Sequence, residues 1–153
     1  MTESLQKDNK TKYESSAGGV VFKKEGNQIY ILLAQHSFHH GWVFPKGLIG
    51  DKDEFKNQTK EETALREVKE ETGAIGEILQ ALNPVQYWYV FQGQKIKKTV
   101  YYFIMKYLDG DITKHDFEME NVEWIKANEV MEKLTYPGDK KVWEQARAII
   151  DNF

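Results

Sequence analysis

The chain carries its most informative stretch at Arg66-Glu67-Val68-Lys69-Glu70-Glu71-Thr72-Gly73. At about 100° per residue, an α-helix brings Glu67, Glu70 and Glu71 to one side within a single turn. Like charges at these spacings cost a few tenths of a kcal/mol per pair on an exposed helix. Two interpretations are open: a solvated acidic face, which is the commoner case, or a site where a divalent cation neutralises the carboxylates. Oxygen ligands suit Mg²⁺, with Mn²⁺ as the second candidate.

Signals at both ends define the helix that carries these acids. Thr59 stands at the N-cap position, and Glu62 three residues later completes a capping box. Gly73 suits the left-handed conformation that often follows the last helical turn. We therefore predict a helix over about 60–72. Its core-facing stripe lies roughly 125° from the acids at about 100° per residue and should consist of Ala64, Leu65, Val68 and Thr72.

The pattern Arg-Glu-hydrophobic-x-Glu-Glu-x-Gly resembles the second half of the Nudix box, the signature of the Nudix hydrolases. The first half of the box is irregular. Phe44-Pro45-Lys46-Gly47 is similar to its beginning, but Gly47 lies 19 residues before Arg66, five more than in the family pattern. The three acids of the helix match the family pattern in full.

The irregular part of the box contains a polar stretch. Gln58 occupies the position eight residues before Arg66, where the family pattern has a glutamate. The additional residues fall at 50–57, a composition suited to a lengthened loop. Either this loop is an insertion, or Asp53 or Glu54 takes the role of the missing acid.

Composition limits the class of protein. The chain has 153 residues with 21 basic and 24 acidic side chains, too balanced for non-specific nucleic-acid binding through a basic face. It has no cysteine and no apolar run long enough for a membrane span, so we expect a cytoplasmic protein. Residues 1–13 are polar and lysine-rich and should form a flexible leader, followed by a single domain over 14–153.

Apolar runs and turn residues predict interleaved strands and helices. Hairpin turns are expected at Glu25-Gly26-Asn27 and Gln92-Gly93-Gln94. The predicted strands cover 16–22, 29–34, 42–44, 75–82, 87–91, 99–107 and 123–125. Two helices, 127–134 and 139–152, follow the acidic helix, and the last has an apolar stripe of Val142, Ala146, Ile149 and Ile150. This order indicates an α+β fold, an α/β/α sandwich with a mixed β-sheet and flanking helices, which is also the Nudix fold.

The resemblance implies roles for individual residues. Glu67, Glu70 and Glu71 would hold Mg²⁺, and Arg66 would orient a glutamate of the box by ion pairing. Lys46 would contact a phosphate. The carbonyl of Gly18, or of the adjacent Gly19, would complete the metal shell, although close strand packing explains the glycine pair equally well.

The general base is expected outside the box. In several Nudix enzymes it precedes a late strand, and here Glu118 stands six residues before Trp124. Glu118 is therefore the first candidate and Glu120 the second. A glutamate in so charged a loop is just as often merely solvated.

Three local features resemble the asymmetrical diadenosine tetraphosphate hydrolases: the segment 39–47 (His-His-Gly-Trp-Val-Phe-Pro-Lys-Gly), the segment 97–103 (Lys-Lys-Thr-Val-Tyr-Tyr-Phe) and the spacing of Glu118 from Trp124. In these segments His40 and Lys98 are candidates for phosphate contacts. A base can stack on an aromatic strand, and alternate residues of a strand share one face. The candidates for base stacking are Tyr87, Tyr89 and Phe91.

The sequence therefore predicts a pyrophosphohydrolase that cleaves a small nucleotide, most simply diadenosine tetraphosphate. An RNA 5′-pyrophosphohydrolase and a nucleotide-sanitising pyrophosphatase share the same catalytic core. A Nudix-fold module that binds nucleotides without cleaving them is the alternative from another class, since Gln58 replaces a glutamate.

Overall fold

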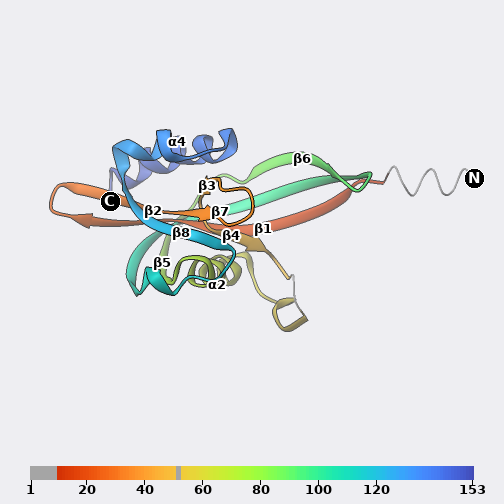
Figure 1. The fold of residues 1–153 in the computed structure, drawn as a ribbon, viewed down its shortest axis with the longest axis horizontal. Coiled ribbons are helices and arrows are strands. Elements are labelled where there is room, and N and C mark those ends of the chain that lie inside the picture. The colour runs from red at the N-terminus through yellow and green to blue at the C-terminus, as the bar shows by residue number, and fades with distance from the viewer. Residues whose placement is uncertain (1–9, 51–52) are drawn as a thin grey trace, which may run out of the picture.

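A mixed β-sheet lies between helix α2 on one face and helix α4 on the other (Figure 1). The structure, a computed structural model, describes residues 10–50 and 53–153, without the side chain of Asp53. The strands are β1 (Lys12–Glu25), β2 (Gln28–His36), β3 (Trp42–Val43), β4 (Lys46–Leu48), β5 (Ala74–Ala81), β6 (Val85–Phe91), β7 (Gln94–Gly110) and β8 (Met119–Lys126). The helices are α2 (Lys60–Thr72), α3 (Val130–Lys133) and α4 (Pro137–Ile150), with 3₁₀ turns η1 (Asp53–Phe55), η2 (Ile112–Lys114) and η3 (Ala127–Glu129).

The sheet is organised around the parallel pair of β1 and β7, whose register runs from Lys12↔Ile96 to Phe22↔Lys106. All other pairs are antiparallel. On its other edge β1 has two neighbours in turn: β4 along Ser16–Gly18 and β2 along Phe22–Glu25. Along this edge the strand that pairs with β1 therefore changes from β4 to β2, close to helix α2.

Side chains alternate between two cores, one on each face of the sheet. Val20 and Phe22 of β1 pack in the core that contains Trp143 of α4. Val21, on the opposite face, packs in the core that contains Val68 of α2. This alternation is the period of a strand buried on both faces, and the predicted α+β sandwich is confirmed.

Helix α2 has the predicted bounds and caps. The Thr59 hydroxyl accepts from the Glu62 N–H (3.1 Å) and the Glu62 carboxylate accepts from the Thr59 N–H (3.1 Å). Gly73 ends the helix with φ 81°, in the region that disfavours residues with a Cβ. Ala64, Val68 and Thr72 are buried as predicted.

The predicted core-facing stripe of α2 is wrong at one residue, and the acidic side of the helix is partly buried. Leu65 is 37% exposed, because it lies at the edge of the apolar stripe. Glu67 and Glu71 are buried, with 6% and 3% exposed. The reason is β4, which was not predicted and packs beside α2.

Both predicted hairpins are confirmed. Gly26 (φ 60°) lies in the turn between β1 and β2. Gln92 (φ 51°) and Gly93 (φ 76°) form the turn between β6 and β7, with both residues in the conformation that a tight hairpin needs.

Other predicted bounds require correction. Lys12 and Tyr13 belong to β1 and pair with β7, so the described part of the predicted leader is partly strand; residues 1–9 lie outside the described residues. The predicted helix 127–134 is divided into η3 and α3. In the described part of the chain, no helix is both long enough and apolar enough to cross a membrane.

Candidate active site

A cleft of about 850 Å³ lies where α2 meets β4 and the segment before β8. We call it the acid cleft. Its carboxylates come from α2 and from that segment: Glu67, Glu70, Glu71, Asp116 and Glu118. Its cationic side chains are Lys46, Arg66, Lys69, Lys98 and Lys114. The three predicted carboxylate ligands, the predicted base and both predicted phosphate lysines therefore share one cleft, whereas Gly18 does not line it.

Glu67 and Glu71 are held in a narrow space under β4. A Cβ added to Gly47 would lie 2.0 Å from the Cδ of Glu67, so the glycine leaves the room that this carboxylate occupies. The Lys46 N–H donates to Glu71 Oε1 (3.2 Å). Burial, followed by the charge of Glu67, raises the pKa of Glu71 well above its ordinary value. Two crowded, desolvated carboxylates favour a bound cation.

Arg66 ties the acids of α2 together. Its Nη1 donates to Glu67 Oε1 (3.0 Å) and lies 3.2 Å from Glu70 Oε2. Its Nε donates to Gln58 Oε1 (2.9 Å), and the guanidinium lies over the Phe55 ring at 3.9 Å. Arg66 thus forms ion pairs with two glutamates of the box, and Gln58 supplies an amide oxygen where the family pattern has a carboxylate.

Asp53 and Glu54 are the two acids that could replace the glutamate missing at position 58. Glu54, in η1, is exposed. The side chain of Asp53 lies outside the described residues. The role proposed for either acid stays a prediction.

Two lysines face the acids from the sheet side. Lys46 begins β4, and Lys98 lies on β7 opposite Glu14 of β1. Burial, and then repulsion from Lys46, lower the pKa of Lys98. A phosphate between these two ammonium groups would relieve their repulsion.

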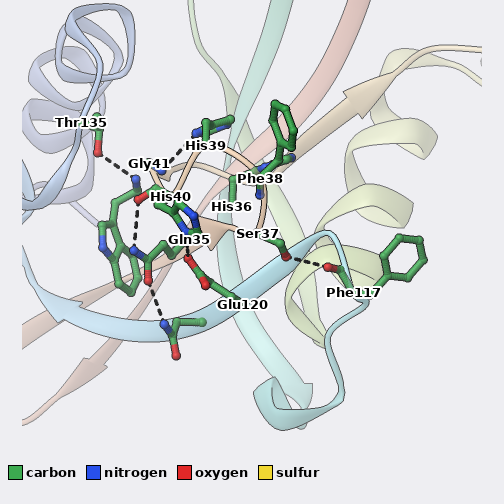
Figure 2. Close-up of polar contacts among 12 residues, drawn as sticks. Gln35, His36, Ser37, Phe38, His39, His40, Gly41, Phe117, Glu120 and Thr135 are labelled. Carbon is green, nitrogen blue, oxygen red and sulfur yellow. Dashed lines mark hydrogen bonds and ion pairs between the residues drawn. The ribbon is translucent and has the colours of Figure 1, made fainter.

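Glu118 lies in the acid cleft, whereas Glu120 does not line it. Glu120 is paired with the imidazole of His40 (Nδ1 to Oε1, 2.5 Å; Figure 2). Asp116 lies beside Glu118 and accepts from its N–H (3.1 Å). Burial raises the pKa of Asp116, followed by the charge of Glu70. The geometry thus favours Glu118, the first candidate.

A second, more apolar cleft of about 600 Å³ lies between the sheet and the start of α4. We call it the tyrosine cleft, because Tyr87, Tyr102 and Tyr136 line it. Asp139 of α4 also lines it and accepts from the Tyr102 hydroxyl (3.3 Å). Lys46 lines both clefts, so the two are neighbours.

The loop between β2 and β3 contributes His39 to the tyrosine cleft, and not the predicted His40. His40 is exposed, with φ 61°, and does not line either cleft. His39 lines the tyrosine cleft and shares a hydrogen bond with the Tyr136 hydroxyl (2.8 Å). A hollow of about 170 Å³ between the clefts is lined by His36 and His39 together with Lys46, Glu71 and Glu118.

Three other predicted residues, Tyr89, Phe91 and Gly18, do not line either cleft. Tyr89 donates a hydrogen bond to Glu14 Oε1, which together with burial raises the pKa of Tyr89 to about 12. Phe91 is 60% exposed near the tip of the β6–β7 hairpin. A Cβ on Gly18 would lie 2.1 Å from the Pro45 carbonyl oxygen. This close contact accounts for the glycine; its carbonyl as a metal ligand stays a prediction.

The cleft residues that the sequence did not indicate include four polar ones: Ser16, Asp116, Tyr136 and Asp139. Ser16 is 1% exposed, and its hydroxyl has no hydrogen-bond partner among the described residues. None of the four belongs to the Nudix box. Pairing of β1 with β4 brings Ser16 to the site, and the packing of α4 brings Tyr136 and Asp139. A hydrogen bond to the Glu70 carbonyl holds Asp116. No local signal in the sequence indicates these contacts.

A family model described as the NUDIX domain matches residues 12–146. The chain belongs to the Nudix family. It is 34% identical over 148 residues to MutT4 of Mycobacterium tuberculosis, covering 93% of this chain and 58% of that protein. It is 27% identical over 150 residues to the 8-oxo-(d)GTP phosphatase of Mycolicibacterium smegmatis, covering 90% of this chain and 44% of that protein.

This Nudix chain thus spans about half the length of the two mycobacterial relatives. Among solved structures it is similar to a C. elegans Ap4A hydrolase in a binary complex, with a TM-score of 0.69 and 24% identity over 92% of this chain and 99% of that one. These findings confirm the resemblance to the Nudix family and the Nudix fold.

Proposed function

We propose that this Nudix protein hydrolyses a phosphoanhydride bond of a nucleoside polyphosphate with the help of Mg²⁺ or Mn²⁺. A dinucleoside polyphosphate such as diadenosine tetraphosphate is its preferred substrate. One observation carries the proposal: Lys46 joins a cleft of carboxylates to a cleft of tyrosines. A nucleotide whose base lies in the tyrosine cleft would extend its phosphates past Lys46 into the acid cleft.

The acid cleft fits a divalent cation by its chemistry. Glu67, Glu70 and Glu71 offer only oxygen donors, which Mg²⁺ prefers, and two of them are buried beside each other. Across residues 10–50 and 53–153, no three acidic or histidine side chains already stand as a set of ligands. Arg66 and the Lys46 N–H engage these carboxylates instead, so binding requires that some of these contacts are exchanged. Bound cations would neutralise phosphoryl oxygens and lower the pKa of a water molecule.

The protein's own residues would carry the other steps. Lys46 and Lys98 would hold the phosphate chain, and Arg66 would keep Glu67 and Glu70 in place. Glu118 would accept a proton from the attacking water, whose oxygen forms the new bond to phosphorus. The bond between that phosphorus and the bridging oxygen then breaks. The rest of the substrate leaves with the bridging oxygen on its terminal phosphate. Proton transfer of this kind contributes about 10²–10⁴-fold in rate.

Aromatic side chains support a substrate with one base or two. Tyr87 and Tyr136 line the tyrosine cleft, and stacking on an aromatic ring contributes about 1–3 kcal/mol per base. Phe117 lines the acid cleft and is 89% exposed. It offers a second stacking surface at the other end of a polyphosphate chain.

The chief alternative is a nucleotide-sanitising pyrophosphatase, because one relative is named 8-oxo-(d)GTP phosphatase. An RNA 5′ end would also present phosphates to the acid cleft. A module that only binds nucleotides is less favoured, since the three clustered acids Glu67, Glu70 and Glu71 lie in one cleft with Glu118.

A turnover assay tests the proposal. Diadenosine tetraphosphate, 8-oxo-dGTP and triphosphorylated RNA are supplied with Mg²⁺ or with EDTA. We expect diadenosine tetraphosphate to have the highest kcat/KM and EDTA to abolish its cleavage. Glu70→Gln should reduce kcat by about 10²-fold or more. Glu61→Gln, a matched change on the exposed first turn of α2, should not.

The outcomes separate the alternatives. Preference for 8-oxo-dGTP or RNA would overturn the substrate assignment but keep the chemistry. Tight nucleotide binding without cleavage of any substrate would identify a binding module. Cleavage that persists in EDTA, or in Glu70→Gln, would overturn the metal site.

A further inference from the structure

The segment that carries Glu118 is held by the loop between β2 and β3. Ser37 is the residue of this loop that reaches it: the Ser37 hydroxyl donates to the Phe117 carbonyl (2.6 Å; Figure 2). The Ser37 N–H donates to the Glu118 carbonyl (2.8 Å). One residue, about 80 positions away in the chain, thus bonds the peptide groups on both sides of the Glu118 Cα.

The same segment is fixed to α2 from the other side. The Glu118 N–H donates to Asp116 Oδ1 (3.1 Å). The Asp116 N–H in turn donates to the carbonyl of Glu70 (2.9 Å). The backbone of Glu118 is therefore linked through two bonds to a residue that is a candidate metal ligand.

The loop that carries Ser37 is itself constrained. The His40 N–H donates to the His36 carbonyl (2.9 Å), and His40 adopts φ 61°, which a residue with a Cβ tolerates only when its surroundings require it. The rings of His36 and His39 stack with centroids 4.2 Å apart. The hydrogen bond between the Tyr136 hydroxyl and His39 Nδ1 anchors the loop to the wall of the tyrosine cleft.

We propose that Ser37 is a positioning residue for the hydrolytic reaction: it sets Glu118 at the distance from the acids of α2 that proton transfer requires. This inference rests on the proposed role of Glu118 as the base. A hydrogen bond from a partly exposed serine contributes only about 1 kcal/mol to stability. Its effect on rate can be larger, because a displacement of about 1 Å can cost on the order of 10²-fold.

The test is a double-mutant cycle between Ser37→Ala and Glu118→Gln, measured as steady-state kinetics on diadenosine tetraphosphate with Mg²⁺. Ser37→Ala should lower kcat about tenfold and leave KM within twofold, because the phosphate contacts at Lys46 and Lys98 are untouched. In the Glu118→Gln background the same change should have no further effect, because the group that it positions is gone. Ser37→Thr, which keeps the hydroxyl, should restore kcat.

The matched control is Gln35→Ala. Gln35 bonds to the same loop at the His40 carbonyl and to Asn121, but not to the segment 116–118, so kcat should stay within twofold. Equal losses from Ser37→Ala in both backgrounds, or a loss confined to KM, would refute the positioning role. If Glu118→Gln alone leaves kcat unchanged, the assignment of the base fails instead. If the wild-type chain cleaves no substrate, the proposed function itself fails.

Discussion

Gly47 shows how a single residue shapes the acid cleft. Because its missing Cβ would fall on the carboxylate of Glu67, any larger residue must push that carboxylate out of its place. The overlap is with the end of a side chain and not with backbone. A substitution there would therefore disturb the acids more than the fold.

Ser16 offers a prediction in which stability and affinity change in opposite directions. Its buried hydroxyl has no partner among the described residues and faces the cleft that Lys46 and Lys98 line. An unsatisfied buried hydroxyl costs about 1–3 kcal/mol, so Ser16→Ala should keep or raise the urea midpoint of the free protein. If the hydroxyl binds a substrate phosphate, KM should rise about three- to tenfold. A lower midpoint with unchanged KM would show that the hydroxyl is purely structural.

Asp139 gives a prediction for the dependence of stability on pH. Burial raises the pKa of its carboxyl, and Lys46 and the Tyr102 hydroxyl offset part of this rise. A raised folded pKa means that its contribution to stability is complete below the unfolded pKa of about 3.9 and is lost as the pH rises through the folded pKa. The amide side chain of Asp139→Asn cannot ionise, so the urea midpoint of this variant should rise relative to that of the wild type as the pH increases above about 4. A difference that stays constant over this range would contradict the burial of the charge.

Individual site residues could be predicted from the sequence where they belong to a local pattern. Glu67, Glu70 and Glu71 follow from helix geometry alone, and they lie together. The sequence predicts a phosphate contact for His40, but it contains no signal that tells which of the two neighbouring histidines turns toward the clefts. In the structure His40 has a left-handed φ and is exposed, whereas His39 lines the tyrosine cleft. Phe91 shares the parity of Tyr87 but lies at the end of the hairpin, beyond the cleft.

Among the elements, α2 was predictable because its signals are local. Thr59, Glu62 and Gly73 specify both ends within the helix itself, and the structure reproduces them. Strand β4 was missed because its three residues (Lys-Gly-Leu) have no strand signal. It exists through pairing with Ser16–Gly18 of β1, a contact that only the folded sheet provides. The burial of Glu67 follows from this unpredicted strand.

The capping box can be tested at the level of the helix. Thr59→Ala removes the acceptor for the Glu62 N–H and should lower the free energy of unfolding by about 1 kcal/mol. The acids lie in the C-terminal half of α2, so the affinity for Mn²⁺ should change by less than twofold. Urea denaturation and Mn²⁺ titration check the two effects. A large loss of affinity would mean that the helix is held as one unit with the cleft.

In the whole molecule, α2 and α4 lie on opposite faces of the sheet (Figure 1). The acids of the acid cleft come from α2 and from the segment before β8, and the start of α4 lines the tyrosine cleft. Lys46 lies at the junction because β4 starts where the edge of β1 changes partner. The overall sandwich could be predicted from the alternation of apolar runs. The meeting of the two clefts could not, because it depends on where distant strands pair.

The acid cleft should make the stability of the whole molecule depend on the divalent cation. The free protein holds two crowded, buried carboxylates, so a cation that binds only the folded state should raise the melting temperature. At about 100 times its Kd the gain is about 2.7 kcal/mol, or about 5–10 °C for a domain of this size.

Glu71→Gln removes one of the two buried charges and gives this prediction its sharpest form. In EDTA the variant should melt at a higher temperature than the wild type, because the repulsion from Glu67 and the burial of the second charge are both relieved. With Mg²⁺ the order should reverse, because the variant has lost a ligand and gains little from the cation. Glu61→Gln, on the exposed turn of the same helix, should respond to Mg²⁺ like the wild type. Differential scanning calorimetry at several Mg²⁺ concentrations measures both effects. Equal shifts in all three proteins would place the cation outside the acid cleft.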